Sequence, residues 1–167
     1  MSMIGEYARV TAAELDRATG DPEWALKLVS GRLEEAAEAA EEPDEALCLD
    51  IDKAWDALGF LLRRTDFPVD VAQGEEAVAG AEDWGYGPPR YLTPARVRVA
   101  AEAMAELSGA SLVSGVAPAD LAEAEVYPAL VWRRGESLDY VSEHYERLRL
   151  FFRAAAEDGE GMLIWLG

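Results

Sequence analysis

Met162-Leu163-Ile164-Trp165-Leu166 is an unbroken run of apolar residues. A strand with one face in water alternates apolar and polar residues, whereas a strand covered on both faces is apolar throughout. Gly159 and Gly161 separate the run from the residues before it, and glycine readily ends a helix. The run therefore predicts a central strand in a sheet that helices cover.

A long amphipathic helix is predicted before this strand, because apolar residues recur there every three or four positions and so share one face. These residues are Leu138, Val141, Tyr145, Leu148, Phe152 and Ala155. A second stripe of this kind predicts a helix over residues 51–64. Its members are Ile51, Trp55, Leu58 and Leu62. Asp50 is its expected N-cap, since an aspartate side chain can accept from the free amides of the first turn.

Capping residues mark further helix starts. Thr11-Ala12-Ala13-Glu14 is a capping box, in which the threonine and glutamate side chains each pair with the other's backbone amide. Asp21-Pro22 and Thr93-Pro94 each place an N-cap residue before a proline at the first helical position. The expected ends of these three helices are Thr19, Gly31 and Leu107. Pro118 is expected to open a short helical turn over residues 118–124.

Three more strands are predicted, over residues 3–10, 47–49 and 129–132, while residues 65–93 show no regular pattern. Strands separated by helices favour a sheet with helices packed on it. The sequence therefore predicts one domain, residues 1–167, of the helix-rich mixed α/β (α+β) class. Its small mixed sheet would be flanked by helices in two or three layers.

The chain is strongly acidic, with 33 acidic and 15 basic residues and a formal net charge of −18. Binding to nucleic acid or to an anionic membrane depends on clusters of Lys and Arg, so the charge argues against both partners. A basic protein or a cation is easier to accommodate, although the charge can also serve solubility alone. The Glu- and Ala-rich residues 32–45 predict a solvated helix or connector, with an acidic docking surface as the alternative.

Several functional classes lack the residues that they need. No apolar segment reaches the roughly 18 residues that cross a bilayer, and the first residues do not resemble a signal peptide, so we expect a cytoplasmic protein. Cys48 and His144 are the only cysteine and histidine, too few for a usual zinc site or a disulfide. Neither a Walker phosphate loop nor a G-x-S-x-G motif occurs. We expect no metal and no cofactor.

Four short segments occur in a characteristic order along the chain. They are Met3-Ile4-Gly5, Leu49-Asp50-Ile51-Asp52-Lys53-Ala54-Trp55-Asp56-Ala57-Leu58, Gly85-Tyr86-Gly87-Pro88-Pro89-Arg90-Tyr91-Leu92 and Glu125-Val126-Tyr127-Pro128. Together they resemble the YfbM-like family, a bacterial domain of unknown function. The resemblance implies an α/β fold with helices flanking a sheet, and it implies no activity.

Asp50 and Asp52 form the first candidate site. A carboxylate pair can bind a cation or act in acid–base chemistry. The alternative is that one carboxylate caps the following helix and the other favours its first turn through the helix dipole. Asp56 lies one turn beyond Asp52 and could extend the pair to a cluster of three acids.

The loop of residues 84–91 is the second candidate site, with Trp84, Tyr86, Arg90 and Tyr91 as its binding residues. Tryptophan, tyrosine and arginine are enriched at binding hot spots, and the loop's glycines and prolines shape and stiffen the backbone. It is no dinucleotide fingerprint, because the third glycine is missing and prolines stand where a helix should open. The alternative is that the aromatic residues cover the edge of the core.

These observations favour a non-catalytic binding or accessory protein, in one form an inhibitor or immunity-type protein for a basic partner. The alternative is a small-molecule-binding protein or enzyme, with Arg90 anchoring an anion beside Asp50 and Asp52. That alternative requires one pocket shared by the loop and the acidic pair. A homodimer that covers the exposed aromatic residues is a third possibility.

Overall fold

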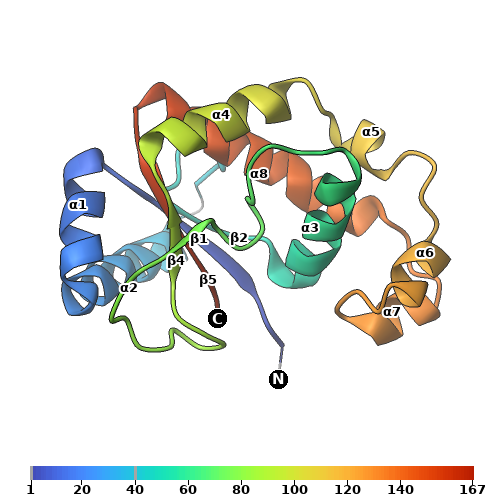
Figure 1. Ribbon diagram of the computed structural model, residues 1–167, viewed down its shortest axis with the longest axis horizontal. Helices are drawn as coiled ribbons and strands as arrows, with labels where there is room; N and C mark the ends of the chain where they lie inside the picture. Colours follow the sequence, from blue (N-terminus) through green and yellow to red (C-terminus); the bar gives the residue numbers. More distant parts are fainter. Residues whose placement is uncertain (1, 40) are drawn as a thin grey trace.

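The computed structural model describes residues 2–39 and 41–167, and its strands form one sheet in the order β2-β1-β5-β4-β3 (Figure 1). The strands are β1 (Gly5–Val10), β2 (Cys48–Asp50), β3 (Glu76–Ala77), β4 (Arg90–Leu92) and β5 (Gly161–Leu166). Each neighbouring pair is antiparallel, and in the longest pairing Tyr7 of β1 lies opposite Ile164 of β5. The central position of β5 agrees with its apolar sequence.

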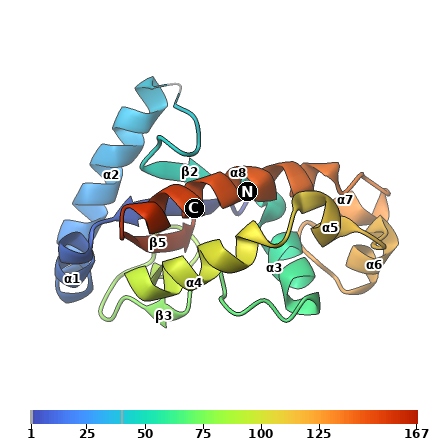
Figure 2. The same ribbon diagram turned by 90° about the horizontal axis from the view of Figure 1, so that it is seen from above.

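Helices cover both faces of the sheet. On one face lie α1 (Ala12–Gly20) and α2 (Pro22–Glu38). The helices that contribute to the core on the other face are α3 (Trp55–Arg64), α4 (Pro94–Ala105), α5 (Gly109–Val113), α6 (Pro118–Glu123), α7 (Ala129–Arg133) and α8 (Asp139–Glu157). One turn of 3-10 helix, η1 (Asp52–Ala54), precedes α3. In Figure 2, α1 and α2 lie at one end of the molecule, α6 and α7 at the other, and α8 runs between them. The predicted helix-rich mixed α/β fold, with helices flanking a small sheet, is confirmed.

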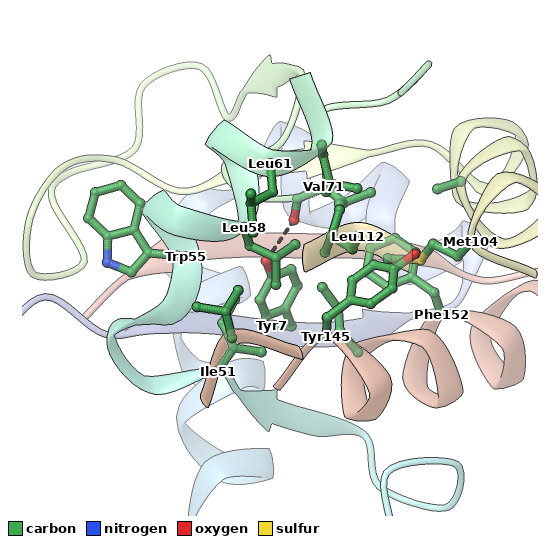
Figure 3. Packing of buried hydrophobic residues seen from close by; sticks show 14 of the residues in the cluster. Tyr7, Ile51, Trp55, Leu58, Leu61, Val71, Met104, Leu112, Tyr145 and Phe152 are labelled. Carbon is green, nitrogen blue, oxygen red and sulfur yellow. Dashed lines mark hydrogen bonds between the residues drawn. The ribbon is translucent and has the colours of Figure 1, made fainter. Parts of the chain in front are cut away.

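Alternate side chains of the strands enter two hydrophobic cores. The larger core includes Tyr7, Leu58 and Phe152, each of which is completely buried (Figure 3). The Tyr7 hydroxyl donates a 2.6 Å hydrogen bond to the carbonyl oxygen of Val71, so the polar atom of this side chain has a partner within the core. The smaller core lies on the opposite face, where Ala8 packs with residues of α1 and α2.

The predicted helix caps are present. Thr11 Oγ1 accepts from the Glu14 amide at 3.1 Å, and Glu14 Oε1 accepts from the Thr11 amide at 2.9 Å. Asp21 and Thr93 each accept from the backbone amide three positions later, at 3.2 Å and 3.3 Å. These contacts satisfy amides that have no partner inside the helix, which is why short local patterns located the three helix starts. Within the described residues, no helix combines the length and the apolar character that crossing a bilayer requires.

Residues 129–132 belong to helix α7, so the prediction of a strand there is wrong. The Val131 amide donates to the Pro128 carbonyl oxygen at 3.0 Å, within the turn. Trp132 is 1% exposed and Leu130 is 55% exposed, a difference that reflects the two sides of a short helix. A short apolar run does not distinguish a buried helix from a strand, and here packing against the larger core decided.

Asp50 is the last residue of β2 rather than the N-cap of a continuous helix over residues 51–64. One turn of 3-10 helix, η1, separates β2 from α3, and Asp52 at its start has a left-handed φ of +48°. The aspartate that was expected to start the helix therefore belongs to a sharp strand-to-helix connection. This connection brings Asp52 to the surface of the site described below.

Helix α2 continues through Gly31 to Glu38, so Gly31 does not end it. Leu33 and Ala36 pack against the smaller core, and this packing offsets the low helix propensity of glycine. Of the Glu- and Ala-rich residues 32–45, those up to Glu38 extend the helix, whereas residue 40 lies outside the described residues. The short strands β3 and β4 and the helix α5 were not predicted, and the sheet is antiparallel rather than mixed.

Candidate functional site

A cavity of about 380 Å³ lies between η1, α7 and the start of α8, and we name it the Asp52 cavity. Helix α7 lies with α6 at the end of the molecule far from α1 and α2 (Figure 2). The residues that line it are Asp52, Lys53, Pro128, Val131, Trp132, Glu136, Ser137 and Tyr140. Its volume falls within the range of about 300–1,000 Å³ that is usual for small-molecule sites. The lining combines apolar side chains of α7 with charged side chains of η1.

Tyr140 fixes the polar side of the Asp52 cavity. Its hydroxyl donates a 2.6 Å hydrogen bond to Asp52 Oδ2 and accepts a 3.0 Å hydrogen bond from the Lys53 amide. Burial, followed by the hydrogen bond to Asp52, raises the pKa of Tyr140 far above its usual value. The hydroxyl therefore keeps its proton at neutral pH and holds the carboxylate in one orientation.

Asp50 supports the same arrangement from the backbone side. Asp50 Oδ1 accepts a 3.1 Å hydrogen bond from the Asp52 amide. This contact stabilises the left-handed φ of +48° at Asp52, a conformation that costs free energy for any residue other than glycine. Of the predicted acidic pair, Asp52 lines the cavity, and Asp50 holds the backbone of Asp52 in place.

Asp52 carries its negative charge at neutral pH. Burial raises its pKa, but the hydrogen bond from Tyr140 and the nearby Lys53 ammonium outweigh burial, so the pKa lies below its usual value. Lys53 Nζ lies 3.4 Å from Asp52 Oδ1, and both side chains are partly exposed. The cavity thus contains a fixed carboxylate with one oxygen held by Tyr140 and the other in loose contact with a lysine.

Three of the four segments that resemble the YfbM-like family meet beside the cavity. Trp55 Nε1 donates to the Met3 carbonyl oxygen at 2.9 Å, and the Met3 amide donates to Tyr127 Oη at 3.0 Å. The Trp55 and Tyr127 rings stack, with their centroids 5.6 Å apart. Asp56 Oδ2 accepts from the Tyr127 amide at 2.8 Å. These contacts hold Pro128, the next residue along the chain, in the cavity wall.

His144 lies behind Tyr140 rather than in the lining of the Asp52 cavity. The two rings meet edge to face, with their centroids 4.8 Å apart. Burial lowers the pKa of His144, with a further contribution from Arg147, so the imidazole is neutral at physiological pH. In the described part of the chain its Nδ1 atom is buried without a hydrogen-bond partner. The histidine thus supports the tyrosine by packing.

The aromatic residues of the loop of residues 84–91 mainly pack against the sheet. Trp84 meets Trp165 edge to face at a centroid distance of 5.3 Å, and Tyr91 packs against the smaller core. The Tyr86 amide donates to the Leu166 carbonyl oxygen at 2.9 Å, while the Tyr86 side chain is 40% exposed. Covering the edge of the core, the alternative weighed from the sequence, therefore accounts for Trp84 and Tyr91.

The Arg90 side chain is hydrogen-bonded to the backbone of the two residues that precede β3. Its Nε donates to the Gly74 carbonyl oxygen at 3.1 Å, and its Nη2 donates to the Glu75 carbonyl oxygen at 2.8 Å. Two donors of the guanidinium are therefore bound to backbone oxygens. The predicted role of Arg90 as an anchor for an anion gains no support from this geometry.

The two predicted sites do not come together. Asp52 lines the Asp52 cavity, whereas Tyr86 and Arg90 line a separate cavity of about 170 Å³, and Asp50 borders a third. In the sheet, β2 and β4 are separated by β1 and β5. The pocket shared by the acidic pair and the loop, which the enzyme alternative requires, is not found among the described residues.

Asp56 does not complete a cluster of three acids, because its carboxylate faces the Tyr127 amide. Over residues 2–39 and 41–167, no group of three or more His, Cys, Asp or Glu side chains is arranged to hold a metal ion. Only Asp52 among the residues that line the Asp52 cavity was a predicted site residue; those not predicted are Lys53, Pro128, Val131, Trp132, Glu136, Ser137 and Tyr140. Pro128 and Lys53 belong to segments that the sequence analysis singled out, whereas nothing in the sequence pointed to Val131, Trp132, Glu136, Ser137 or Tyr140 as site residues.

Comparison with known proteins agrees with the fold. The family model described as Domain of unknown function (DUF1877) matches residues 1–165. The crystal structure of a protein of unknown function, YfbM from Escherichia coli, is similar, with a TM-score of 0.66 and 19% sequence identity. The similarity covers 99% of this chain and 100% of that one, and at this identity it concerns the fold alone.

No curated protein matches the chain. The resemblance to the YfbM-like family that the four segments carry is confirmed by both the family model and the solved structure. Because the family model extends over almost the whole sequence, the chain belongs to the DUF1877 family of domains of unknown function.

Proposed function

We propose that this chain is a non-catalytic binding protein whose ligand enters the Asp52 cavity. The observation that carries the proposal is the combination of an apolar wall on α7 with a carboxylate that Tyr140 holds in place. Ligand sites commonly join apolar walls to a few fixed polar groups, which orient the bound molecule. Asp52 is the predicted site residue that lies at such a place.

The protonation of Asp52 and Tyr140 supports binding rather than proton transfer. A general acid or base works best when its pKa is near the working pH. The pKa of Asp52 is lowered and that of Tyr140 is raised, so both groups move away from neutral pH. Each keeps a single protonation state there, as suits a fixed hydrogen-bonding partner for a ligand.

The net charge of −18 supports a basic protein as the partner. A field of this sign attracts basic proteins and repels nucleic acid and anionic membranes. In this proposal the protein acts in the cytoplasm as an accessory protein, and an inhibitor or immunity-type role is its most specific form. We expect affinity for the partner to fall steeply as the salt concentration rises, and a complex that does not respond to salt would contradict a basic partner.

Filling the cavity tests the proposal. Val131→Trp places a large ring in the cavity wall, and Leu26→Trp makes the same kind of change at an exposed position on α2. Native mass spectrometry at low salt would compare the two variants with the unchanged protein after gentle purification from the cells that express it. We expect a stoichiometric adduct on the unchanged protein and on Leu26→Trp, and its loss from Val131→Trp. An adduct that Val131→Trp retains in full would place the binding site elsewhere.

A further inference from the structure

We infer that the ligand of the Asp52 cavity carries a primary alkylammonium group that pairs with Asp52 and takes the place of Lys53. This inference rests on the proposed function, because it names the chemistry of the ligand that the cavity holds. It assigns Asp52 as the counter-ion and Lys53 as an internal cation that a stronger partner displaces.

The charges around the cavity favour a cation. Asp52 and Glu136 contribute two carboxylates, and Lys53 is the one basic residue among the described residues that line the cavity. The net charge of −18 over the whole chain has the same sign as the cavity lining. An anionic ligand would meet repulsion from both, whereas a cation is attracted at long range and within the cavity.

The ion pair between Asp52 and Lys53 is weak enough for the ammonium group of a ligand to replace Lys53. Charge-assisted hydrogen bonds between an ammonium and a carboxylate are usually about 2.7–2.9 Å long. Lys53 Nζ lies 3.4 Å from Asp52 Oδ1, and the two side chains are 37% and 36% exposed. A loose, partly solvated pair of this kind contributes little to stability and can be exchanged.

The hydrogen bond at Asp52 Oδ2 favours an ammonium over a guanidinium as the cationic group of the ligand. A guanidinium binds most strongly when its two parallel donors meet both oxygens of a carboxylate. Asp52 Oδ2 already accepts the short hydrogen bond from Tyr140, so Oδ1 is the oxygen left for a ligand. One available oxygen suits an ammonium, which acts as a point charge.

The apolar wall provides contacts for the stem of such a ligand. Pro128, Val131 and Trp132 lie in the same cavity as the carboxylate. Methylene groups that leave water against this wall contribute favourably to binding. A short alkyl chain ending in an ammonium combines both requirements, and it occurs both in free alkylamines and in the lysine side chain of a partner protein.

Three probes of equal length test the charge of the ligand: 1-pentylammonium, 1-pentanol and pentanoate. Their dissociation constants would be measured by NMR titration of the folded protein at low salt. We expect 1-pentylammonium to bind at least about tenfold more tightly than 1-pentanol, because a charged partner strengthens the contact with Asp52. Pentanoate should bind most weakly.

Two substitutions should shift the affinity for 1-pentylammonium in opposite directions. Asp52→Asn keeps the shape of the side chain and tolerates the left-handed backbone, so we expect it to fold and to reduce the preference over 1-pentanol to about twofold or less. Lys53→Met removes the competing cation and should tighten binding of 1-pentylammonium by about two- to fivefold. Asp83→Asn, an exposed acid outside the cavity lining, is the matched control and should change neither value.

The outcomes separate this inference from the proposed function. If 1-pentanol binds as tightly as 1-pentylammonium, or if Asp52→Asn leaves the preference intact, the cavity binds ligands but the ammonium assignment is wrong. If none of the three probes binds, both the assignment and the binding cavity fail. A further titration with doubly capped lysine distinguishes the sources, because binding equal to that of 1-pentylammonium indicates a partner's lysine and weaker binding indicates a free alkylamine.

Discussion

Tyr140 and Asp52 show how one hydrogen bond can organise a site. The tyrosine hydroxyl links the carboxylate of Asp52 to the amide of Lys53, so a single atom orients both the side chain and the backbone of this turn. Asp50 adds the contact that stabilises the left-handed backbone. The ligand therefore meets a carboxylate whose position is set before binding, which reduces the entropy lost on binding.

Removing the Tyr140 hydroxyl should loosen this arrangement. We expect Tyr140→Phe to lower the free energy of unfolding by about 1–2 kcal/mol, because the Asp52 carboxylate and the Lys53 amide each lose a partner. Urea unfolding at neutral pH measures this change. Tyr86→Phe, at a side chain that is 40% exposed, is the control and should have an effect near zero. An equal loss in both variants would show that Tyr140 does not fix the turn.

Glu6 makes stability depend on pH. It lies on β1 directly between Asp50 and Trp165 in the neighbouring strands. Burial, together with the charge of Asp50, raises the pKa of Glu6 from 4.5 to about 7. The folded protein therefore binds a proton that the unfolded chain has released, so this contribution to stability declines between pH 4.5 and about 7 and is lost above it.

Glu6→Gln should remove this dependence. We expect the variant to match the unchanged protein at pH 4 and to be more stable at pH 8 by about 1–2 kcal/mol, since solvent screens part of the cost of the charge. Urea unfolding at the two pH values gives the difference, with the exposed Glu102→Gln as the control. A stabilisation of the same size at both pH values would show that the titration of Glu6 is not its cause.

At the scale of elements, the loop of residues 84–91 is fitted closely to the end of β5. Gly85 has a φ of +122°, and a Cβ atom there would lie 2.7 Å from the Leu166 carbonyl oxygen. Gly87 has nearly the same φ, +123°, but a Cβ there would have nothing within 4 Å. The two glycines thus separate the cost of the backbone conformation from the cost of a steric clash.

We expect Gly85→Ala to be more destabilising than Gly87→Ala. Both variants bear the strain of a side chain at this φ, of the order of 1–3 kcal/mol, and only the first adds a clash with the strand. Thermal unfolding of the two variants measures the difference. Equal losses would mean that the loop moves away from β5 without cost.

The accuracy of prediction also differed between elements. The caps at Thr11, Asp21 and Thr93 were predictable because each depends on contacts within one turn. The strands β3 and β4 were not, because residues 65–93 show no regular pattern and these short strands are defined by their pairing with other strands. The sequence predicted a strand where α7 lies, because four consecutive apolar residues show neither the helical nor the strand period of hydrophobicity. Only the structure shows that Trp132 is buried while Leu130 is exposed.

At the scale of the whole molecule, the dominant property is the charge of −18. Like charges distributed over one small protein repel one another and destabilise the compact state. Salt screens this repulsion, with a Debye length that falls to about 10 Å at 0.1 M. The charge therefore influences stability as well as the choice of partner.

We expect the unfolding temperature to rise as NaCl increases from about 10 mM to about 300 mM, because screening relieves the repulsion. Differential scanning fluorimetry provides the measurement, and KCl at equal ionic strength should give the same shift. A fall in the unfolding temperature with salt would mean that ion pairs, such as that of Arg9 with Asp158 and Glu160, outweigh the net repulsion.

Much of this protein is determined by the sequence alone: the acidic character, the capped helices, the central apolar strand, the mixed α/β class and the family. Each of these depends on composition or on neighbours within a few residues. The site is different, since Asp52 was predicted but its partner Tyr140 lies 88 positions away along the chain. Only the tertiary structure placed α7 and the start of α8 beside η1, because α7, α8 and the helix α3 that follows η1 pack in one core, and no local pattern records that contact.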